Sequence, residues 1–394
     1  PVTLGAVSGL GMTDINGQSF GVWKAGASQG SGEMRVGNGT VTGTATIALG
    51  STTRQTITVQ VASATLIANS GMTTAVTATV VDHYGNPLAG AVLNGTTLPP
   101  MLGNIDSFGL TDTNGKTYST WRAGGTVSNG LLQVSSGSTI SGTVPITLTT
   151  GAPFTVSLQA FPAILTVGNT SVIIATVTDQ YGNRVADGTV VTFTNDLTAT
   201  VSQATTSNGT ANALLSSTLP VTAHITATIS TATGPARNLT VATFVPDEPF
   251  SLALQAAPTL LVVGNSSTLT ATVRDRFNNL VTNGTPVGFT TDFGNVLSLV
   301  TTVQGAATSQ VNSIIAGTAH ITAASGIAQN SGAVTFAPDV PATTTLQVNP
   351  TTLAIGSGAT AVLTATVVDR YLNPVPGFSV SASITPTTLG TVIW

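Results

Sequence analysis

Cysteine is absent from this 394-residue sequence, so disulfide bonds play no part in its fold. Charged side chains are also scarce, at 6% of residues against roughly 25% in an ordinary soluble domain. Lysine occurs only at Lys24 and Lys116, no basic cluster exists, and the formal net charge is −4. The sequence therefore offers no electrostatic surface on which nucleic acid would bind.

Long apolar runs are missing as well, so no segment is predicted to span a membrane. The N-terminus has no charged-then-apolar signal segment, and we expect either that one was removed or that the sequence is part of a longer chain. Low charge does not indicate disorder here, because Val, Ile and Leu are abundant and regularly spaced. A β-rich chain with much Thr and little Lys is typical of a secreted protein at the cell surface.

A nine-residue pattern is present four times, at 78–86, 175–183, 271–279 and 365–373. Its aspartates, Asp82, Asp179, Asp275 and Asp369, recur at intervals of 97, 96 and 94 residues. Before each aspartate, apolar residues alternate with mostly polar ones, which predicts a half-buried strand. Ile173, Ala175 and Val177 are predicted to point inward in the second copy, and Thr176 outward. The run that follows, Asp-x-Tyr/Phe-x-Asn, supplies the residues of a tight polar turn.

The repeat divides the chain into tandem units and predicts an all-β array of immunoglobulin-like sandwiches. The boundaries are 1–51 (a C-terminal half-domain), 52–152, 153–247, 248–339 and 340–394 (an N-terminal half-domain). Four-residue joints, three of them containing proline, predict that neighbouring units sit end to end. In the unit 153–247, we expect strands at 154–160, 163–167 (a continuation of the first), 170–178, 188–194, 197–202, 210–216, 221–230 and 237–245.

The run from Ala175 to Phe193, with Ser207–Ala211 after it, resembles the bacterial immunoglobulin-like repeat of the intimin/invasin kind (group 1). The resemblance extends in whole or part to every unit. Two departures are Gly95, where Phe193 and Phe289 stand in other units, and Leu372 in place of Gly182. Because Gly95 has no side chain, the core of 52–152 must be repacked there. Membership would imply a seven-stranded sandwich, export, and use as a stalk or adhesive array, with no catalytic residues.

The candidate site residues are few, and each has a structural alternative. His224 and His320 hold matched places one repeat apart, and the alternation turns them outward, so they cannot share a metal ion within one chain. The repeated aspartates could suggest calcium, but the acidic spacing of an oxygen cage is missing and turn capping is favoured. Asp187 and the joint Pro246–Pro249 are secondary candidates for an interdomain ion.

No nucleophile–base–acid set, phosphate loop or distinct carboxylate pair recurs, so we predict no enzyme, cofactor or metal site. Seven Asn-x-Ser/Thr sequons permit N-linked glycan without requiring it, and the Thr-rich faces likewise permit O-linked sugar. Two functions stay open: a structural rod or filament on the outside of a microbial cell, and the stalk of an adhesin whose binding tip lies beyond this sequence. Lysine-poor sheet edges favour self-association and hence the filament.

The two ends occupy the same place in the repeat, since Pro1–Val7 matches Pro386–Val392. Either the C-terminal half-unit of one molecule completes the N-terminal half-unit of the next, or the missing halves continue in a longer covalent array. Because completion by a second molecule would supply one strand twice, the overlap favours the longer array.

Overall fold

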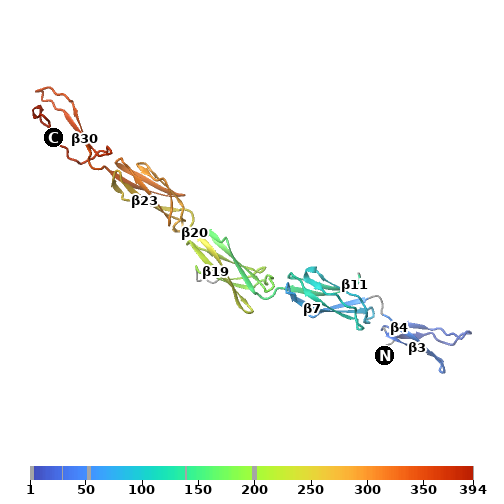
Figure 1. The fold of residues 1–394 in the computed structure, drawn as a ribbon. Coiled ribbons are helices and arrows are strands. Elements are labelled where there is room, and N and C mark those ends of the chain that lie inside the picture. The colour runs from blue at the N-terminus through green and yellow to red at the C-terminus, as the bar shows by residue number, and fades with distance from the viewer. Residues whose placement is uncertain (1–3, 29, 51–54, 138–139, 198–201, 394) are drawn as a thin grey trace.

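The computed structural model describes residues 4–28, 30–50, 55–137, 140–197 and 202–393 as a row of β-sandwiches with the two ends of the chain far apart (Figure 1). The two helical elements in these ranges are single 3-10 turns, η1 (Pro100–Leu102) and η2 (Thr387–Leu389). Within the described ranges, no helix has the length and apolar character needed to cross a membrane.

The first sandwich holds two four-stranded sheets, ordered β5-β7-β10-β9 and β6-β12-β11-β8. Its strands are β5 (Gln55–Val61), β6 (Thr65–Ile67), β7 (Thr73–Asp82), β8 (Asn94–Leu98), β9 (Gly103–Ile105), β10 (Lys116–Ala123), β11 (Ser128–Ser136) and β12 (Ile140–Thr149).

The second sandwich pairs a three-stranded sheet, β13-β15-β18, with a five-stranded one, β14-β20-β19-β16-β17. Its strands are β13 (Thr155–Phe161), β14 (Ile164–Thr166), β15 (Thr170–Thr178), β16 (Val190–Asn195), β17 (Ser202–Thr205), β18 (Thr210–Ser216), β19 (Val221–Thr231) and β20 (Gly234–Val245). They match the predicted strands except that β17 begins only at Ser202; of the predicted strand 197–202, residues 198–201 lie outside the described ranges.

The third sandwich has sheets ordered β21-β23-β27-β25 and β22-β29-β28-β24-β26. Its strands are β21 (Ser251–Ala257), β22 (Leu260–Val262), β23 (Ser266–Arg274), β24 (Pro286–Thr291), β25 (Asn295–Val296), β26 (Leu299–Thr301), β27 (Ala306–Asn312), β28 (Gly317–Ser325) and β29 (Ala328–Ala337). The all-β array of tandem sandwiches that the repeat predicts is confirmed.

The short second strand of each sandwich corrects one expectation. β14 follows β13 along the chain, but it lies in the opposite sheet, where it pairs in parallel with the last strand, β20. β6 pairs with β12 and β22 with β29 in the same way. The segment is therefore a crossing between sheets and not a continuation of the first strand. With it, the described parts of the first two sandwiches contain eight strands each, one more than the resemblance implied.

The alternation in β15 places its apolar side chains in the core as predicted. Ile173, Ala175 and Val177 are buried, while Thr176 is half-buried on the outer face. In the first sandwich, the space beside Gly95 is filled by Ile105 and Phe108, which an added Cβ at that glycine would strike. The repacking that this glycine required is therefore present.

Among the described residues of the two end segments, no buried hydrophobic cluster of this kind is formed. The N-terminal segment (residues 4–50) contains β1 (Gly5–Ser8), β2 (Val22–Ala25), β3 (Gly30–Gly37) and β4 (Thr42–Leu49), paired as β1-β2 and β3-β4. The C-terminal segment (residues 340–393) contains one pair, β30 (Thr343–Asn349) and β31 (Val362–Val368). The three buried hydrophobic clusters all lie in the complete sandwiches.

Candidate functional site at the domain joints

The Asp-x-Tyr/Phe-x-Asn turn after β23 shows how the repeated aspartate is used. Oδ1 of Asp275 accepts hydrogen bonds from the backbone N–H groups of Phe277 (2.9 Å) and Asn279 (2.8 Å). Oδ2 accepts one from the side-chain amide of Asn279 (3.0 Å). The same three bonds form at Asp82, Asp179 and Asp369, so the turn-capping interpretation is confirmed.

Oδ2 of these aspartates also holds the linker that enters the domain. The backbone N–H of Asp247 donates to Asp275 at 3.1 Å. At the neighbouring joints, Gly151 donates to Asp179 (2.7 Å) and Asp339 donates to Asp369 (3.0 Å). The turn therefore fixes the direction in which the chain arrives from the preceding sandwich.

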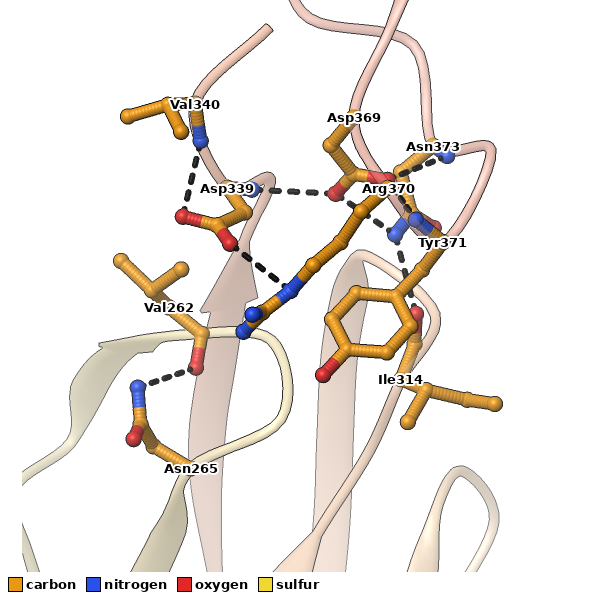
Figure 2. A network of polar contacts seen from close by, with 9 residues as sticks. All are labelled: Val262, Asn265, Ile314, Asp339, Val340, Asp369, Arg370, Tyr371 and Asn373. Atoms are coloured by element: carbon orange, nitrogen blue, oxygen red, sulfur yellow. Dashed lines mark hydrogen bonds and ion pairs between the residues drawn. The ribbon is translucent and has the colours of Figure 1, made fainter. Parts of the chain in front are cut away.

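The asparagine of each turn reaches the preceding domain itself. Its Nδ2 donates both to the turn aspartate and to a main-chain carbonyl across the joint. The four pairs are Asn86 to Ala27 (2.6 Å), Asn183 to Ala68 (2.7 Å), Asn279 to Thr218 (2.8 Å) and Asn373 to Ile314 (2.9 Å). We call each Asp–Asn pair with these bonds a joint clamp; Figure 2 shows the one formed by Asp369 and Asn373.

The aromatic residue of the turn packs on a glycine of the preceding sandwich. Phe277 covers Gly168, and Tyr371 covers Gly264. Both glycines have positive φ values, of 82° and 87°, which favour glycine. An added Cβ would also overlap the aromatic ring, so the contact itself excludes a side chain at these positions. At the joint between the first two sandwiches, Asn69 (φ 58°) holds this place and its Nδ2 donates to the Tyr181 carbonyl (2.7 Å).

Two of the joints also carry an ion pair. Nε of Arg276 lies 2.9 Å from Oδ2 of Asp247, and Nε of Arg370 lies 3.1 Å from Oδ2 of Asp339. Each guanidinium also lies over the neighbouring turn aromatic, Phe277 or Tyr371, about 5 Å from the ring centre, as Figure 2 shows for Arg370. Because both arginines are more than half exposed, solvent screens these pairs to about 1 kcal/mol or less each.

Three of the clamp aspartates, Asp179, Asp275 and Asp369, have a lowered pKa and are held as carboxylates. Burial by itself would raise the pKa of Asp369, but hydrogen bonds from the Asn373 side chain and from the backbone of Asp339, Asn373 and Tyr371 outweigh it and lower the pKa to about 2. The same balance lowers the pKa of Asp179 and Asp275.

Because the pKa of Asp369 is lowered, the hydrogen bonds of the last joint should persist to low pH. The stabilisation from ionised Asp369 is present above its ordinary pKa of 3.8 and is lost as the pH falls through about 2. We expect the Asp369 carboxyl carbon to titrate in NMR with a midpoint near 2 and the clamp to be intact at pH 5. A midpoint near 3.8 would show that the four donors do not stabilise the carboxylate.

The carboxylate oxygens at the joints are thus occupied by N–H donors and do not form a metal cage. In the part of the chain that the structure describes, no group of three or more His, Asp or Glu side chains could hold a metal ion. Of the secondary candidates, Asp187 accepts the Asn208 backbone N–H (2.6 Å), and Asp247 of the joint Pro246–Pro249 pairs with Arg276.

His224 and His320 point outward as predicted, and each has a partner that the sequence analysis missed. Asp196 accepts the backbone N–H of His224 and contacts its Nδ1, both at 2.8 Å. Asp292 holds His320 in the same way, at 2.7 and 2.8 Å. Hydrogen bonds from the histidine backbone and ring lower the pKa of both aspartates. The signal was available, since both the aspartates and the histidines recur at 96 residues.

Known structures match this row of sandwiches, whereas no protein-family model matches the chain. The crystal structure of invasin, a bacterial integrin-binding protein, aligns with a TM-score of 0.50 and 22% identity, over 79% of this chain and 67% of invasin. The chain has the fold of invasin's tandem immunoglobulin-like domains. The resemblance seen at Ala175–Phe193 to the repeat of the intimin/invasin kind is confirmed at the level of the fold.

Two further structures match with lower TM-scores. The Escherichia coli adhesin FdeC matches with 16% identity and a TM-score of 0.47, over 72% of this chain and 96% of its own. Yersinia pseudotuberculosis InvD matches with 24% identity and a TM-score of 0.40, over 56% and 72%. At these TM-scores the two add nothing to the invasin-like fold assignment.

Proposed function

We propose that the chain is a non-enzymatic, extracellular rod that forms the stalk of a microbial cell-surface adhesin. The observation that carries this proposal is the joint clamp, which recurs with the same donors at four successive boundaries. A repeated clamp serves a protein whose task is to hold its domains in line. Invasin, whose fold the chain shares, is an integrin-binding protein, and a stalk would present such a binding domain away from the cell.

The clamp resists bending because it fixes both the linker and the neighbouring sandwich to one buried side chain. Asp275 is almost fully buried and joins the Asp247 backbone to the turn, while Asn279 bridges to Thr218. Hydrogen bonds to a charged group contribute about 1.5–3 kcal/mol each. A hinge motion would have to break several of them together, so free tumbling of neighbouring sandwiches is suppressed.

A filament is the second candidate function, and exposed apolar side chains on edge strands favour it. Ile164 on β14 and Leu260 on β22 occupy the same repeat position and are both well exposed. Edge strands without lysine, proline or charge invite pairing with another copy.

Glycan attached to the chain is the alternative way to cover these edge strands. All seven sequon asparagines are exposed: Asn38, Asn94, Asn169, Asn208, Asn238, Asn265 and Asn283. Electron micrographs of native material would show single rods for a stalk and bundled fibres for a filament.

Small-angle scattering tests the rod directly. We expect a radius of gyration far above the ~21 Å of a single 394-residue globule, and a distance distribution with the long tail of an elongated particle. Measurement at several concentrations separates the shape of one molecule from association. A value near 21 Å for the monomer would contradict the end-to-end arrangement and with it the stalk.

A further inference from the structure

The short crossing strand of each sandwich is bound to the last strand by main-chain hydrogen bonds. In the second sandwich, β14 pairs in parallel with β20 over three residues. Two further bonds extend this pair: the Thr243 N–H donates to the Ala163 carbonyl (2.8 Å), and the Val167 N–H donates to the Val245 carbonyl (2.9 Å). The first and third sandwiches have the same bonds: Thr147 to Ala64 and Thr335 to Thr259 (both 2.8 Å), and Ala68 to Thr149 and Val263 to Ala337 (both 2.9 Å).

The first strand of each sandwich also contacts the last one directly. In the second and third sandwiches, an asparagine amide on the last strand donates to a main-chain carbonyl of the first strand. The two bonds are Asn238 to Val156 (3.0 Å) and Asn330 to Leu252 (3.1 Å). In the first sandwich the backbones themselves come together, since an added Cβ at Gly142 on β12 would strike the Ile57 carbonyl on β5. We call the parallel pair and this contact together the latch of a sandwich; in the second sandwich it comprises β14, β20 and the Asn238–Val156 bond.

The latch lies on the path that tension would take through a sandwich. The chain enters the second sandwich at β13, beside the joint that the Asp179 clamp fixes. β14 ends at the opposite joint, where Phe277 covers Gly168. β20 ends at that joint too, because Val245 directly precedes the linker to the third sandwich. Tension along the row of sandwiches (Figure 1) therefore draws β13 and β14 toward one joint and β20 toward the other.

Parallel pairing turns this tension into a shear. The hydrogen bonds between β14 and β20 run from strand to strand, across the direction of the pull, so they bear the load together. If the two strands were pulled apart from the same end, the bonds would instead bear the load one after another. The strands β15 to β19 stay out of the path for as long as β13 and β14 remain on β20.

We propose a further function for this arrangement: each sandwich bears tension along the row, and the latch is the part that resists it. Unfolding under load begins with the loss of the latch, so the unfolding rate depends on these few bonds and not on the total stability of the sandwich. Sandwiches in series carry the same tension, and the weakest one gives way first. A latch in all three sandwiches, with the same main-chain bonds, meets this requirement.

The proposal deepens the stalk function and rests on it in one respect: tension reaches the row only if the protein is anchored on one side and held on the other. The two proposals can fail separately. A compact shape in solution scattering would contradict the stalk. Pulling on single molecules measures the resistance of the sandwiches themselves, whatever holds them in the native setting.

The direction of pulling gives the first test, because the chain has no cysteine and DNA handles can be attached at introduced thiols. In the full 394-residue chain, Glu248→Cys/Val340→Cys loads the third sandwich from end to end. Glu248→Cys/Ile327→Cys loads it from one end, because Ile327 lies in the β28–β29 turn, where an added Cβ at Gly326 would contact Pro249 at 3.7 Å. All three substituted positions are exposed.

The same bonds are thus sheared in one geometry and separated in sequence in the other. At the same pulling force, we expect the third sandwich to unfold at least about tenfold faster when it is loaded from one end. Equal unfolding rates in the two geometries would overturn the proposal.

Removing the side-chain bond tests the latch at constant geometry, with Ala152→Cys/Glu248→Cys as handles around the second sandwich. Asn238→Ala takes away the donor to the Val156 carbonyl. Asp196→Ala is the matched control, because it removes an exposed hydrogen-bonding side chain of the same sandwich that lies outside the latch. Under end-to-end load, the unfolding rate should rise about two- to tenfold for Asn238→Ala, the effect of one hydrogen bond, and stay unchanged for Asp196→Ala. A rate that rises equally in both variants, or in neither, would overturn the proposal.

Discussion

Replacing Val177 by Asp in β15 is expected to unfold the second sandwich. Val177 is fully buried between Val156, which lies opposite it on β13, and the facing sheet. An unpaired charge at such a site costs several kcal/mol, a large part of the roughly 5–15 kcal/mol that stabilises a domain. Hydrogen exchange with mass spectrometry should show lost protection throughout residues 155–197 and 202–245, with β5–β12 and β21–β29 still protected.

The neighbouring Thr176 provides the control, because it stands on the outer face of the same strand. Thr176→Asp is expected to change the stability of the second sandwich by about 1 kcal/mol or less. If both variants lost protection equally, the assignment of the inner and outer faces of β15 would be wrong. If Val177→Asp also unfolded the neighbours, the sandwiches would fold as one cooperative unit rather than as separate ones.

The second large effect is expected at the joint between the second and third sandwiches. Asp275→Ala removes the acceptor of four donors: the N–H groups of Asp247, Phe277 and Asn279 and the Asn279 amide. Each buried donor left without a partner costs about 1–3 kcal/mol. We expect the third sandwich to lose more than about 2 kcal/mol of stability and the joint to bend, which scattering would record as a smaller radius of gyration.

Asp292→Ala is the matched control, since it removes an aspartate from the same sandwich at an exposed position. Asp292 holds His320 at the surface, away from the joint, and its loss is expected to leave both the radius of gyration and the stability nearly unchanged. An Asp275→Ala variant as extended and as stable as this control would show that the clamp does not set the joint.

The strands and their faces could be predicted from the sequence because the information is local. Alternation in a strand has a period of two residues, so the order of Ile173, Ala175 and Val177 was enough to place them inside. The turn after each strand was predictable for the same reason. Asp275 caps N–H groups only two and four residues away.

The clamp could not be predicted as a contact between domains, because its acceptor is a backbone carbonyl, which no residue type in the sequence marks. The sequence identifies Asn279 only as a turn residue, and the Thr218 carbonyl that it binds is 61 residues away on another sandwich. The pairing of His224 with Asp196, 28 residues apart on adjoining elements, is a different case, because the common 96-residue spacing of both residues was visible in the sequence and was overlooked. The crossing of β14 to the opposite sheet likewise depends on β20, which arrives some 70 residues later in the chain.

The backbone acceptors of the clamp on the preceding domain have a consequence for how the number of repeats can change in evolution. The acceptors are main-chain carbonyls of two alanines, a threonine and an isoleucine (Ala27, Ala68, Thr218 and Ile314), so the bond does not depend on the side chain of the acceptor residue. A duplicated repeat would bring its own Asp and Asn, and its clamp would require no particular side chain at the acceptor position of the new neighbour. We therefore expect the hydrogen bonds of the clamp to be kept when a whole repeat is inserted or removed, which would change the length of the row by one domain.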